Sequence, residues 1–497
     1  MNRGLGSWPA RRAAISPDRV ALVFGDDSWT YGQMSDRITR LAHRLRAEGV
    51  GRGDRVAYLG PNHPALVETL FATHLLGGIF VPLNFRLTSA EVAYQLEHSG
   101  ARLLIRAPEC AAAQAPATIL VPELAGPERP EPADLETIDT ELDDPAFILY
   151  TSGTTGRPKG AVLTHGNVIW NTFNLLVGVD VAGDEVTLIG APLFHVAALN
   201  QCLLPTVLKG GRSVIMPSWD AEAALELIES QRVTWMFGVS AMFAALARSP
   251  RWASTDLSSL RCVMSGGAAV PPALIRAYQE RGLTFCQGYG MTETAPGATF
   301  LEARASLSHV GSAGVPVFFT DVRAVRPDLT GTSPEEPGEV LVRGPNVTPG
   351  YWNDPAATAA AFTDGWLHTG DIAAVGADGH FRILDRLKDM YISGGENVYP
   401  AEVEAALFTH PAVAEAAVIG VPDEKWGESG HAFVVPAAGR PPSAGELRAH
   451  LTERLAKYKI PAVFTIVDDL PRTGSNKVRK AELRRRFNPL PHQRDAS

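Results

Sequence analysis

Helix-like and strand-like patterns alternate along the first third of the chain. Thr30 and Gln33 match a capping box, in which two side chains bond backbone N–H groups at the start of a helix. Apolar residues then recur at helical spacing up to Gly49, a residue type that commonly ends helices. The pattern beyond predicts a strand, a helix and a strand, over residues 55–59, 63–76 and 79–83. Strand–helix–strand order with short connections favours a parallel α/β sheet.

The pattern changes late in the chain, where charged residues from Asp385 onward interrupt an apolar run. Pro400 suits the first position of a helix, and Ser443 with Glu446 matches the cap of another helix. Strand-like segments lie between these two helices, over residues 416–421 and 432–435. The sequence therefore predicts two domains, residues 1–384 and a self-contained α+β domain over residues 385–497.

The composition is that of an ordinary globular protein. Of 497 residues, 45% are hydrophobic and 20% are charged, and 54 acidic against 45 basic residues give a net charge of −9. This balance argues against nucleic acid as a partner, because nucleic-acid binding needs a broad basic face. The cysteines form no CxxC pair, which argues against a disulfide framework or a thiolate zinc site. With neither a secretory signal nor an apolar run long enough for a bilayer, we expect a soluble, cytoplasmic protein without a membrane partner.

The strongest local signal is a loop rich in glycine, serine and threonine between Tyr150 and Gly160. Glycine lets backbone N–H groups turn toward phosphate oxygens, the hydroxyls donate hydrogen bonds, and Lys159 adds a positive charge. The same residue types also build polar surface turns, so the spacing alone leaves a phosphate site and a plain turn both open. The loop is not a Walker motif, because Pro158 stands where that motif enters its helix.

Further motifs follow this loop along the chain. They are residues 287–293, 369–371, 385–389, 393–400 and 471–477. Together with the loop, these segments resemble the signature motifs of the adenylate-forming superfamily, which includes acyl-CoA synthetases, peptide-synthetase adenylation domains and beetle luciferases. The resemblance covers nearly the whole chain. It implies a large N-terminal α/β domain of several subdomains with parallel sheets, and a small mobile α+β C-terminal domain that rotates about Asp385.

The resemblance implies a reaction in two halves that uses ATP, Mg²⁺ and coenzyme A. A carboxylate attacks the α-phosphorus of ATP and releases pyrophosphate, and a thiol then displaces AMP from the acyl adenylate. The residues implied in ATP binding are Thr151, Ser152, Gly153, Thr154, Thr155, Gly156, Lys159, Gly267, Ala268, Gly288, Tyr289, Gly290, Thr292, Asp371, Ile383, Arg386 and Lys477. Thr155 and Glu293 are the implied Mg²⁺ ligands, since magnesium prefers one or two carboxylates together with phosphate oxygens and water.

Four residues are implied in catalysis by the resemblance: His195, Thr292, Glu293 and Lys477. The ammonium group of Lys477 neutralises charge that grows at the α-phosphate and the carboxylate. The superfamily pattern usually has glycine directly before this lysine, whereas this chain has Asn476, a residue type that tolerates left-handed backbone. The small domain then turns about its hinge and presents the residues implied for coenzyme A: Lys388, Ser393, Gly394, Gly395 and Glu396.

The implied acyl pocket is informative for the charges that it lacks. Its residues are His195, Ala197, Phe237, Ser240, Gly266, Gly290, Pro296 and Gly297. An amino-acid substrate needs a carboxylate for its ammonium group, and a dicarboxylate substrate needs an arginine. Neither lies in these segments, so we expect an acid with a neutral tail. The glycines and Ala197 make a flat wall that suits an aromatic ring better than a coiled alkyl chain. His195 fits either a structural position or a pocket position that bonds a ring hydroxyl.

This pocket pattern is similar to that of 4-coumarate–CoA ligases, and the chain as a whole resembles bacterial feruloyl-CoA synthetases. We therefore predict an ATP-dependent hydroxycinnamate–CoA ligase for ferulate or a close relative, acting as a monomer or homodimer. A medium-chain fatty acid would keep the same mechanism, and the pocket glycines alone do not separate the two acids. A carrier-protein thiol is disfavoured because no carrier-like segment follows residue 497. A catalytically inactive nucleotide-binding regulator is disfavoured by the intact set of Lys477, Glu293 and Asp371.

Overall fold

The computed structural model describes residues 3–110, 115–125, 138–151, 158–267, 270–393, 396–423, 426–437, 440–472 and 478–487. The chain divides into two compact units. The first comprises Met1–Arg323, Leu341–His368 and Gly379–Phe381, and the second comprises Ala324–Val340, Thr369–Asp378 and Arg382–Ser497. The predicted domain boundary at Asp385 lies within the last of these ranges, and its role as a hinge stays a prediction.

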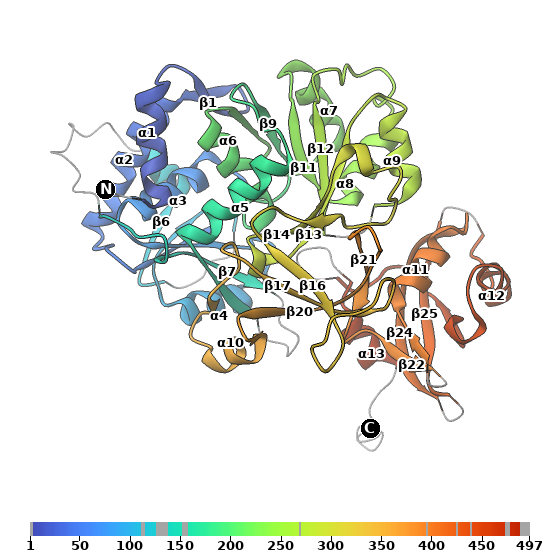
Figure 1. The fold of residues 1–497 in the computed structure, drawn as a ribbon. Coiled ribbons are helices and arrows are strands. Elements are labelled where there is room, and N and C mark those ends of the chain that lie inside the picture. The colour runs from blue at the N-terminus through green and yellow to red at the C-terminus, as the bar shows by residue number, and fades with distance from the viewer. Residues whose placement is uncertain are drawn as a thin grey trace. The chain divides into compact units, whose positions relative to one another are not determined.

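The first unit contains a nine-stranded sheet in the order β15–β14–β13–β12–β11–β9–β10–β1–β2 (Figure 1). Its strands are β1 (Val20–Phe24), β2 (Asp27–Thr30), β9 (Val186–Ile189), β10 (Arg212–Ile215), β11 (Trp235–Gly238), β12 (Cys262–Gly266), β13 (Phe285–Gly290), β14 (Gly297–Leu301) and β15 (Val315–Pro316). From β13 to β1 the neighbours in this order run parallel, whereas β2, β14 and β15 join in antiparallel pairs. The sheet is therefore mainly parallel, as the sequence predicts.

The central strands of this sheet are buried on both faces. Met236 and Val263 pack into a core shared with the helices α7, α8 and α9. Phe237 and Met264, the next residues along the same strands, pack into the larger core on the opposite face. Parallel strands with both faces covered are nearly continuous in hydrophobic residues, which is why these segments lack a simple alternation of polar and apolar positions.

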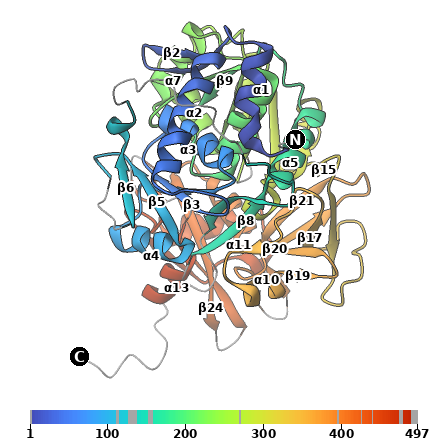
Figure 2. The ribbon, with the colours of Figure 1, turned by 90° about the vertical axis from the view of Figure 1, so that its left-hand side faces the viewer.

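A second sheet of the first unit has the order β18–β8–β7–β4–β3–β5–β6. Its strands are β3 (Arg55–Leu59), β4 (Ile79–Leu83), β5 (Ala101–Arg106), β6 (Ala117–Leu120), β7 (Pro145–Thr151), β8 (Lys159–Thr164) and β18 (Gly350–Tyr351). The strands β3 and β4 are parallel and are joined through α3 (Pro64–Leu75), so the predicted strand–helix–strand unit is confirmed. Figure 2 shows β3 and β5 beside α4, with α2 and α3 next to each other.

The remaining strands form two smaller sheets. One has the order β16–β17–β20–β19 with β21 beside β20, and the other has the order β23–β22–β25–β24 with β26 beside β25. Their bounds are β16 (Asp321–Val325), β17 (Gly338–Arg343), β19 (Phe362–Thr363), β20 (Trp366–Val375), β21 (Phe381–Arg386), β22 (Tyr391–Ser393), β23 (Glu396–Val398), β24 (Val413–Asp423), β25 (Gly427–Pro436) and β26 (Val463–Ile466).

The helices begin where the sequence supplies caps. Thr30 and Gln33 form the predicted capping box of α2, and Ser443 and Glu446 form that of α12. The helices are α1 (Trp8–Ile15), α2 (Tyr31–Ala47), α3 (Pro64–Leu75), α4 (Ser89–Ser99), α5 (His165–Gly178), α6 (Leu204–Lys209), α7 (Ala221–Ser230), α8 (Ser240–Arg248), α9 (Pro272–Gln279), α10 (Pro355–Ala361), α11 (Pro400–Phe408), α12 (Ala444–Thr452) and α13 (Lys480–Phe487). Within the described ranges, none of them has both the length and the apolar character of a bilayer-crossing helix.

The C-terminal part of the second unit has its own core. The antiparallel strands β24 and β25 carry Val418 and Val434 into a cluster with α11 and α12. The neighbouring residues Ile419 and Phe433 point to the other face, where they meet Leu483 of α13. This is the self-contained α+β arrangement that the sequence predicts for the end of the chain.

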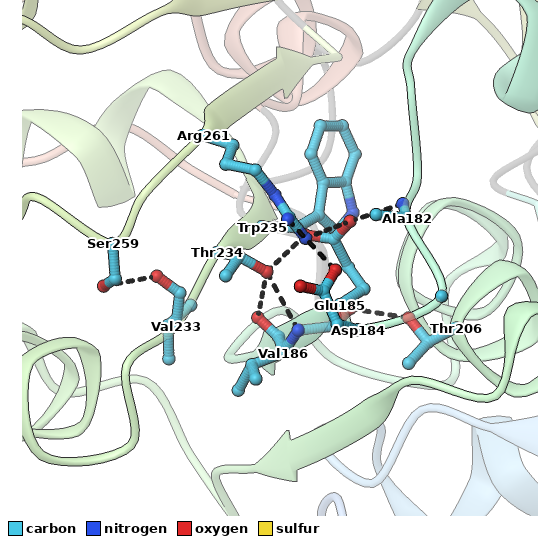
Figure 3. A network of polar contacts seen from close by, with 12 residues as sticks. Ala182, Asp184, Glu185, Val186, Thr206, Val233, Thr234, Trp235, Ser259 and Arg261 are labelled. Atoms are coloured by element: carbon cyan, nitrogen blue, oxygen red, sulfur yellow. Dashed lines mark hydrogen bonds and ion pairs between the residues drawn. The ribbon is translucent and has the colours of Figure 1, made fainter.

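A buried carboxylate joins three strands at the amino edge of the nine-stranded sheet (Figure 3). Glu185 precedes β9 and is 3% exposed, Thr234 precedes β11, and Arg261 precedes β12. Arg261 Nη2 lies 3.0 Å from Glu185 Oε2, and the Thr234 hydroxyl donates to Glu185 Oε1. The backbone N–H of Ala182 donates to Oε2 at 2.9 Å. Because ligands of open α/β sheets bind at the carboxyl edge, we assign this network to stability.

Replacing Glu185 with Gln should lower the free energy of unfolding by about 1–3 kcal/mol, because it removes the charge that compensates a partly buried guanidinium. The shift of the urea unfolding midpoint measures this loss. Asp184→Asn is the matched control, since Asp184 pairs with the same Arg261 at 3.1 Å while its side chain is 76% exposed. We expect no measurable shift for the control, and equal shifts in the two variants would contradict the assignment.

Candidate active site

Many of the predicted site residues of the first unit lie at the carboxyl edge of the nine-stranded sheet. The strands β9, β11, β12 and β13 are parallel neighbours, so they end at the same edge. The residues that end these strands or follow them are His195, Ala197, Phe237, Ser240, Gly266, Gly267, Gly288, Tyr289 and Gly290. Open α/β sheets bind their ligands outside this edge. The fold therefore brings together residues that lie up to about a hundred positions apart in the sequence.

The predicted phosphate loop connects the antiparallel strands β7 and β8. Its two ends are close, because Thr151 pairs with Lys159 in the ladder and the Thr151 hydroxyl donates to the Lys159 carbonyl at 3.5 Å. The ammonium group of Lys159 lies 5.1 Å from the ring centroid of Tyr351. The loop is thus a hairpin connection with a lysine at its base, whereas a Walker loop runs from a strand into a helix.

The carboxylate of Glu293 is held in a buried turn. Glu293 is 4% exposed and lies in the short 3₁₀ turn Thr292–Thr294, directly after β13. The Tyr351 hydroxyl donates to Glu293 Oε1 at 2.9 Å, and the Thr348 N–H donates to the Glu293 carbonyl at 2.8 Å. Burial and the Glu293 charge raise the pKa of Tyr351 well above its ordinary value, so the hydroxyl keeps its proton and acts as the donor.

Glu293 and its neighbour Thr292 fit a site that binds magnesium together with a nucleotide. One buried carboxylate, with the half-buried Thr292 beside it, gives hard oxygen donors but no all-protein cage. Magnesium usually keeps several waters and takes its other ligands from substrate phosphates. Glu293 would therefore hold one side of the ion, and the nucleotide would complete its coordination. The other predicted ligand, Thr155, lies outside the described residues.

The glycines predicted to form a wall of the acyl pocket lie at the ends of β12 and β13 and at the start of β14. A Cβ on Gly266 would lie 3.2 Å from the Phe237 ring, so these two residues pack directly. Gly290 and Gly297 are paired across β13 and β14, and a Cβ on Gly290 would collide with the Pro296 carbonyl. Larger side chains do not fit at Gly266 or Gly290 without movement of these neighbours.

The three remaining pocket residues lie on segments that follow β9 and β11. His195 is half-buried, and its ring centroid lies 4.4 Å from that of Phe194. Ala197 is half-buried against the larger core, and Ser240 is the first residue of α8. The planes of the two rings are tilted by 54°, and both of the roles that the sequence leaves open for His195 stay predictions.

The sequence interpretation missed a group of buried amide side chains beside this wall. Asn171 accepts a hydrogen bond from the Gly297 N–H at 3.1 Å, and Asn200 donates to the Ala295 carbonyl at 3.0 Å. Gln201 is 4% exposed, and its amide nitrogen lies 4.0 Å from where a Cβ on Gly297 would stand. Its Oε1 has no hydrogen-bond partner among the described residues.

The position of Gln201 is unusual in its backbone as well. It lies in the π-helical turn Ala198–Leu203, a conformation that is rare and occurs frequently at functional sites. The sequence signal that could have identified it is a pair of amides, Asn200 and Gln201, within an otherwise apolar run after His195. An unpaired buried amide costs about 1–3 kcal/mol, so a ligand that satisfies it gains affinity.

The second unit contains the pair predicted to bind the ribose. Asp371 in β20 is 5% exposed, and Arg386 Nε at the end of β21 lies 2.9 Å from Asp371 Oδ1. The Thr369 hydroxyl accepts a hydrogen bond from the Asp371 N–H at 3.1 Å and donates to the Val340 carbonyl at 2.7 Å. Ile383 is half-buried on β21. The carboxylate of Asp371 is therefore held in a fixed orientation by Arg386.

Asp385, the predicted hinge, is bonded to the start of a helix. Its Oδ1 accepts from the Arg386 N–H and its Oδ2 from the Ala401 N–H in the first turn of α11, both at 2.7 Å. Burial raises the pKa of Asp385, and the Lys480 ammonium opposes this shift. Of the predicted coenzyme A residues, Ser393 is buried in β22, while Lys388 and Glu396 are exposed.

Several predicted residues lie outside the described part of the chain. They are Ser152, Gly153, Thr154, Thr155, Gly156, Ala268, Gly394, Gly395 and Lys477. Their roles in phosphate, adenine, metal and coenzyme A binding stay predictions.

Two family models match this chain. A model of the AMP-binding enzyme family matches residues 9–352, and a model of the AMP-binding enzyme C-terminal domain matches residues 402–477. The matched ranges include the phosphate loop, the Glu293 turn and Lys477.

Relatives match over nearly the full length. The chain is 54% identical to a feruloyl-CoA synthase from Amycolatopsis over 492 residues, which are 98% of this chain and 99% of that protein. Among solved structures, the o-succinylbenzoate CoA synthetase of Bacillus subtilis in complex with its acyl-adenylate intermediate has a TM-score of 0.89 at 38% identity, covering 96% of this chain and 97% of that one. The same enzyme in complex with ATP and a magnesium ion has a TM-score of 0.89 at 37% identity, covering 96% and 99%.

Proposed function

The chain belongs to the AMP-binding enzyme family, and we propose that it joins a hydroxycinnamic acid, ferulic acid or a close relative, to coenzyme A at the expense of ATP. It is an acid–thiol ligase that forms an acyl adenylate and then a thioester. The observation that supports the substrate class is a set of small residues, Gly266, Gly290 and Gly297, with the Phe237 ring packed against Gly266, and we take them as one wall of the acyl pocket. Such a wall is flat and uncharged, and it suits a planar ring with a neutral substituent.

In the first half-reaction, an oxygen of the acid's carboxylate attacks the α-phosphorus of ATP, and pyrophosphate leaves. Lys159 at the base of the phosphate loop supplies a positive charge for the β- and γ-phosphates. Glu293 and Thr155 would hold Mg²⁺, which offsets negative charge on the phosphates when bound, and the Thr292 hydroxyl would donate to a phosphate oxygen. Lys477 meets the charge that develops between the two reacting anions. The chain's contribution is positioning and electrostatic stabilisation, since phosphoryl transfer leaves little covalent work to the protein.

In the second half-reaction, the thiol sulfur of coenzyme A attacks the acyl carbon, and AMP leaves with its phosphate oxygen. We propose that rotation about Asp385 exchanges Lys477 for the segment that contains Ser393 and Glu396. Asp371 and Arg386 retain the nucleotide through both halves, because a carboxylate of fixed orientation can accept both ribose hydroxyls.

The amide of Gln201 supports an acid with a polar ring substituent. Its oxygen is buried without a partner among the described residues, its amide nitrogen lies beside Gly297, and a phenol hydroxyl is a donor that this oxygen could accept from. An alkyl chain would leave this oxygen unpaired at a cost of about 1–3 kcal/mol. The observation therefore favours a hydroxylated aromatic acid over a medium-chain fatty acid.

Replacing Gln201 with Leu should reduce the preference for hydroxylated rings. In pyrophosphate-release assays with ferulate, 4-coumarate, cinnamate, benzoate and octanoate, we expect kcat/KM of the unaltered chain to be highest for ferulate or 4-coumarate. In the variant, the ratio of kcat/KM for 4-coumarate to kcat/KM for cinnamate should fall roughly 10-fold to 100-fold, because one buried hydrogen bond is lost. Gln95→Leu is the control, because Gln95 is also buried at 4% exposure but lies on α4.

Two results would count against this proposal. Octanoate as the best substrate of the unaltered chain would favour the fatty-acid alternative. If the ratio of the two kcat/KM values, for 4-coumarate and for cinnamate, is unchanged in the Gln201 variant, the amide has no role in substrate selection. ATP binding without turnover of any acid would instead indicate an inactive regulator.

Replacing Lys477 with Ala should separate the two half-reactions. Adenylate formation should fall by about 10²–10³ or more, because one donor to a developing charge is removed. Thiolysis of a supplied feruloyl adenylate should stay within a few-fold of the unaltered rate. Both rates are measured separately by rapid quench. Arg479→Ala is the control, because Arg479 is a half-exposed cation two residues away in the sequence. Comparable losses in both half-reactions of the Lys477 variant would refute a role for Lys477 in adenylation alone.

A further inference from the structure

One segment of the first unit makes several hydrogen bonds to the turn that contains Glu293. Residues 346–351 are called the strap here. The amide of Asn346, fully buried, donates to the carbonyls of Thr294 and Gly297, each at 2.7 Å. Thr348 adds its backbone hydrogen bond to the Glu293 carbonyl. The strap thereby fixes the backbone of Glu293 and of the residues that follow it.

Tyr351, at the end of the strap, acts on the side chain of Glu293. Its hydroxyl is 2.9 Å from Glu293 Oε1, and its backbone pairs with Ala161 of β8, two residues from Lys159. The Lys159 ammonium lies over the Tyr351 ring, 5.1 Å from the centroid. One tyrosine thus contacts both the carboxylate and the ammonium that the adenylation reaction needs.

The two contacts use different parts of the side chain. The hydroxyl orients the carboxylate, because a hydrogen bond to a charged acceptor is directional and strong. The ring attracts the ammonium through its negative face, which is a weaker and less directional interaction. Removing the hydroxyl alone therefore tests the first contact while leaving the ring in place.

We propose that Tyr351 is a positioning residue of the adenylation half-reaction, which orients Glu293 toward the metal–nucleotide complex and holds Lys159 near the phosphates. This inference rests on the proposed function of Glu293 and Lys159. A carboxylate with one oxygen anchored presents its ligand oxygens in a single orientation. The Glu293 side chain is therefore already ordered in the folded chain, and metal binding does not have to restrict it further. The site is thus organised before the nucleotide binds.

A purely structural role for Tyr351 makes a different prediction. A buried tyrosine hydroxyl that bonds only for stability would affect unfolding and leave metal–nucleotide binding unchanged. Tyr31 is such a case and serves as the control, because it is fully buried on α2 and donates to the Gly211 carbonyl at 2.6 Å. Tyr31→Phe and Tyr351→Phe remove the same atom from the same unit of the full chain.

The test measures binding of Mn²⁺–ATP to the full-length Tyr351→Phe, Tyr351→Leu and Tyr31→Phe variants by electron paramagnetic resonance of the manganese. We expect Tyr351→Phe to weaken Mn²⁺–ATP binding roughly 10-fold, as for the loss of one hydrogen bond to a charged group. Tyr351→Leu should weaken it further, because the ring that holds Lys159 is lost too. Tyr31→Phe should bind as the unaltered chain does. In the pyrophosphate assay, Tyr351→Phe should raise the Mg²⁺ concentration for half-activation while KM for the acid stays unchanged.

Unaltered Mn²⁺–ATP binding in Tyr351→Phe would overturn the proposal, and so would an equal loss in Tyr31→Phe. If Tyr351→Leu fails to fold, the pair of phenylalanine variants still decides the question. The binding measurement needs no acid. A chain that binds Mn²⁺–ATP and shows the Tyr351 effect but uses no hydroxycinnamate would refute the proposed substrate and leave the role of Tyr351 standing.

Discussion

The shared carboxyl edge of the parallel strands β9, β11, β12 and β13 is the constraint on which the site of the first unit depends. Parallel strands all begin at one edge and end at the other, so segments far apart in sequence leave the sheet side by side. The chain uses its two edges differently. At the amino edge, Glu185 is neutralised by Arg261 and ties strands together. At the carboxyl edge, Gly266 and Gly290 have no side chain, and their neighbours approach the backbone closely.

Buried polar groups near the site fall into two kinds. Those of Asn346 and Asn171 bond the backbone of the segment 294–297 and so hold Gly297 in place. The oxygen of Gln201 has no such partner within the described residues. A fold rarely retains an unpaired buried amide, because its desolvation is not repaid within the protein. The oxygen of Gln201 shares this state with Asn200 Oδ1, and we propose a substrate contact for Gln201 alone.

Local features of the fold could be predicted because their causes are local. The capping boxes at Thr30 and Ser443 and the helix start at Pro400 depend on residues three positions apart or fewer, and all are confirmed. The strands 55–59 and 79–83 were found with their observed bounds. What periodicity could not give was the order of strands in each sheet, which depends on contacts across the whole chain.

By itself, the sequence determined the chemistry of the motifs: which residues carry phosphate donors, which carry carboxylates, and that the pocket segments lack charge. Only the tertiary structure decided which of these side chains meet. Tyr351 is 58 residues from Glu293, and nothing in the local pattern of either segment records their hydrogen bond. Gln201 looks like an ordinary polar residue until the fold buries it beside Gly297. The reason is physical: the cost of burying a polar group, and the partner that offsets it, exist only after distant strands have packed.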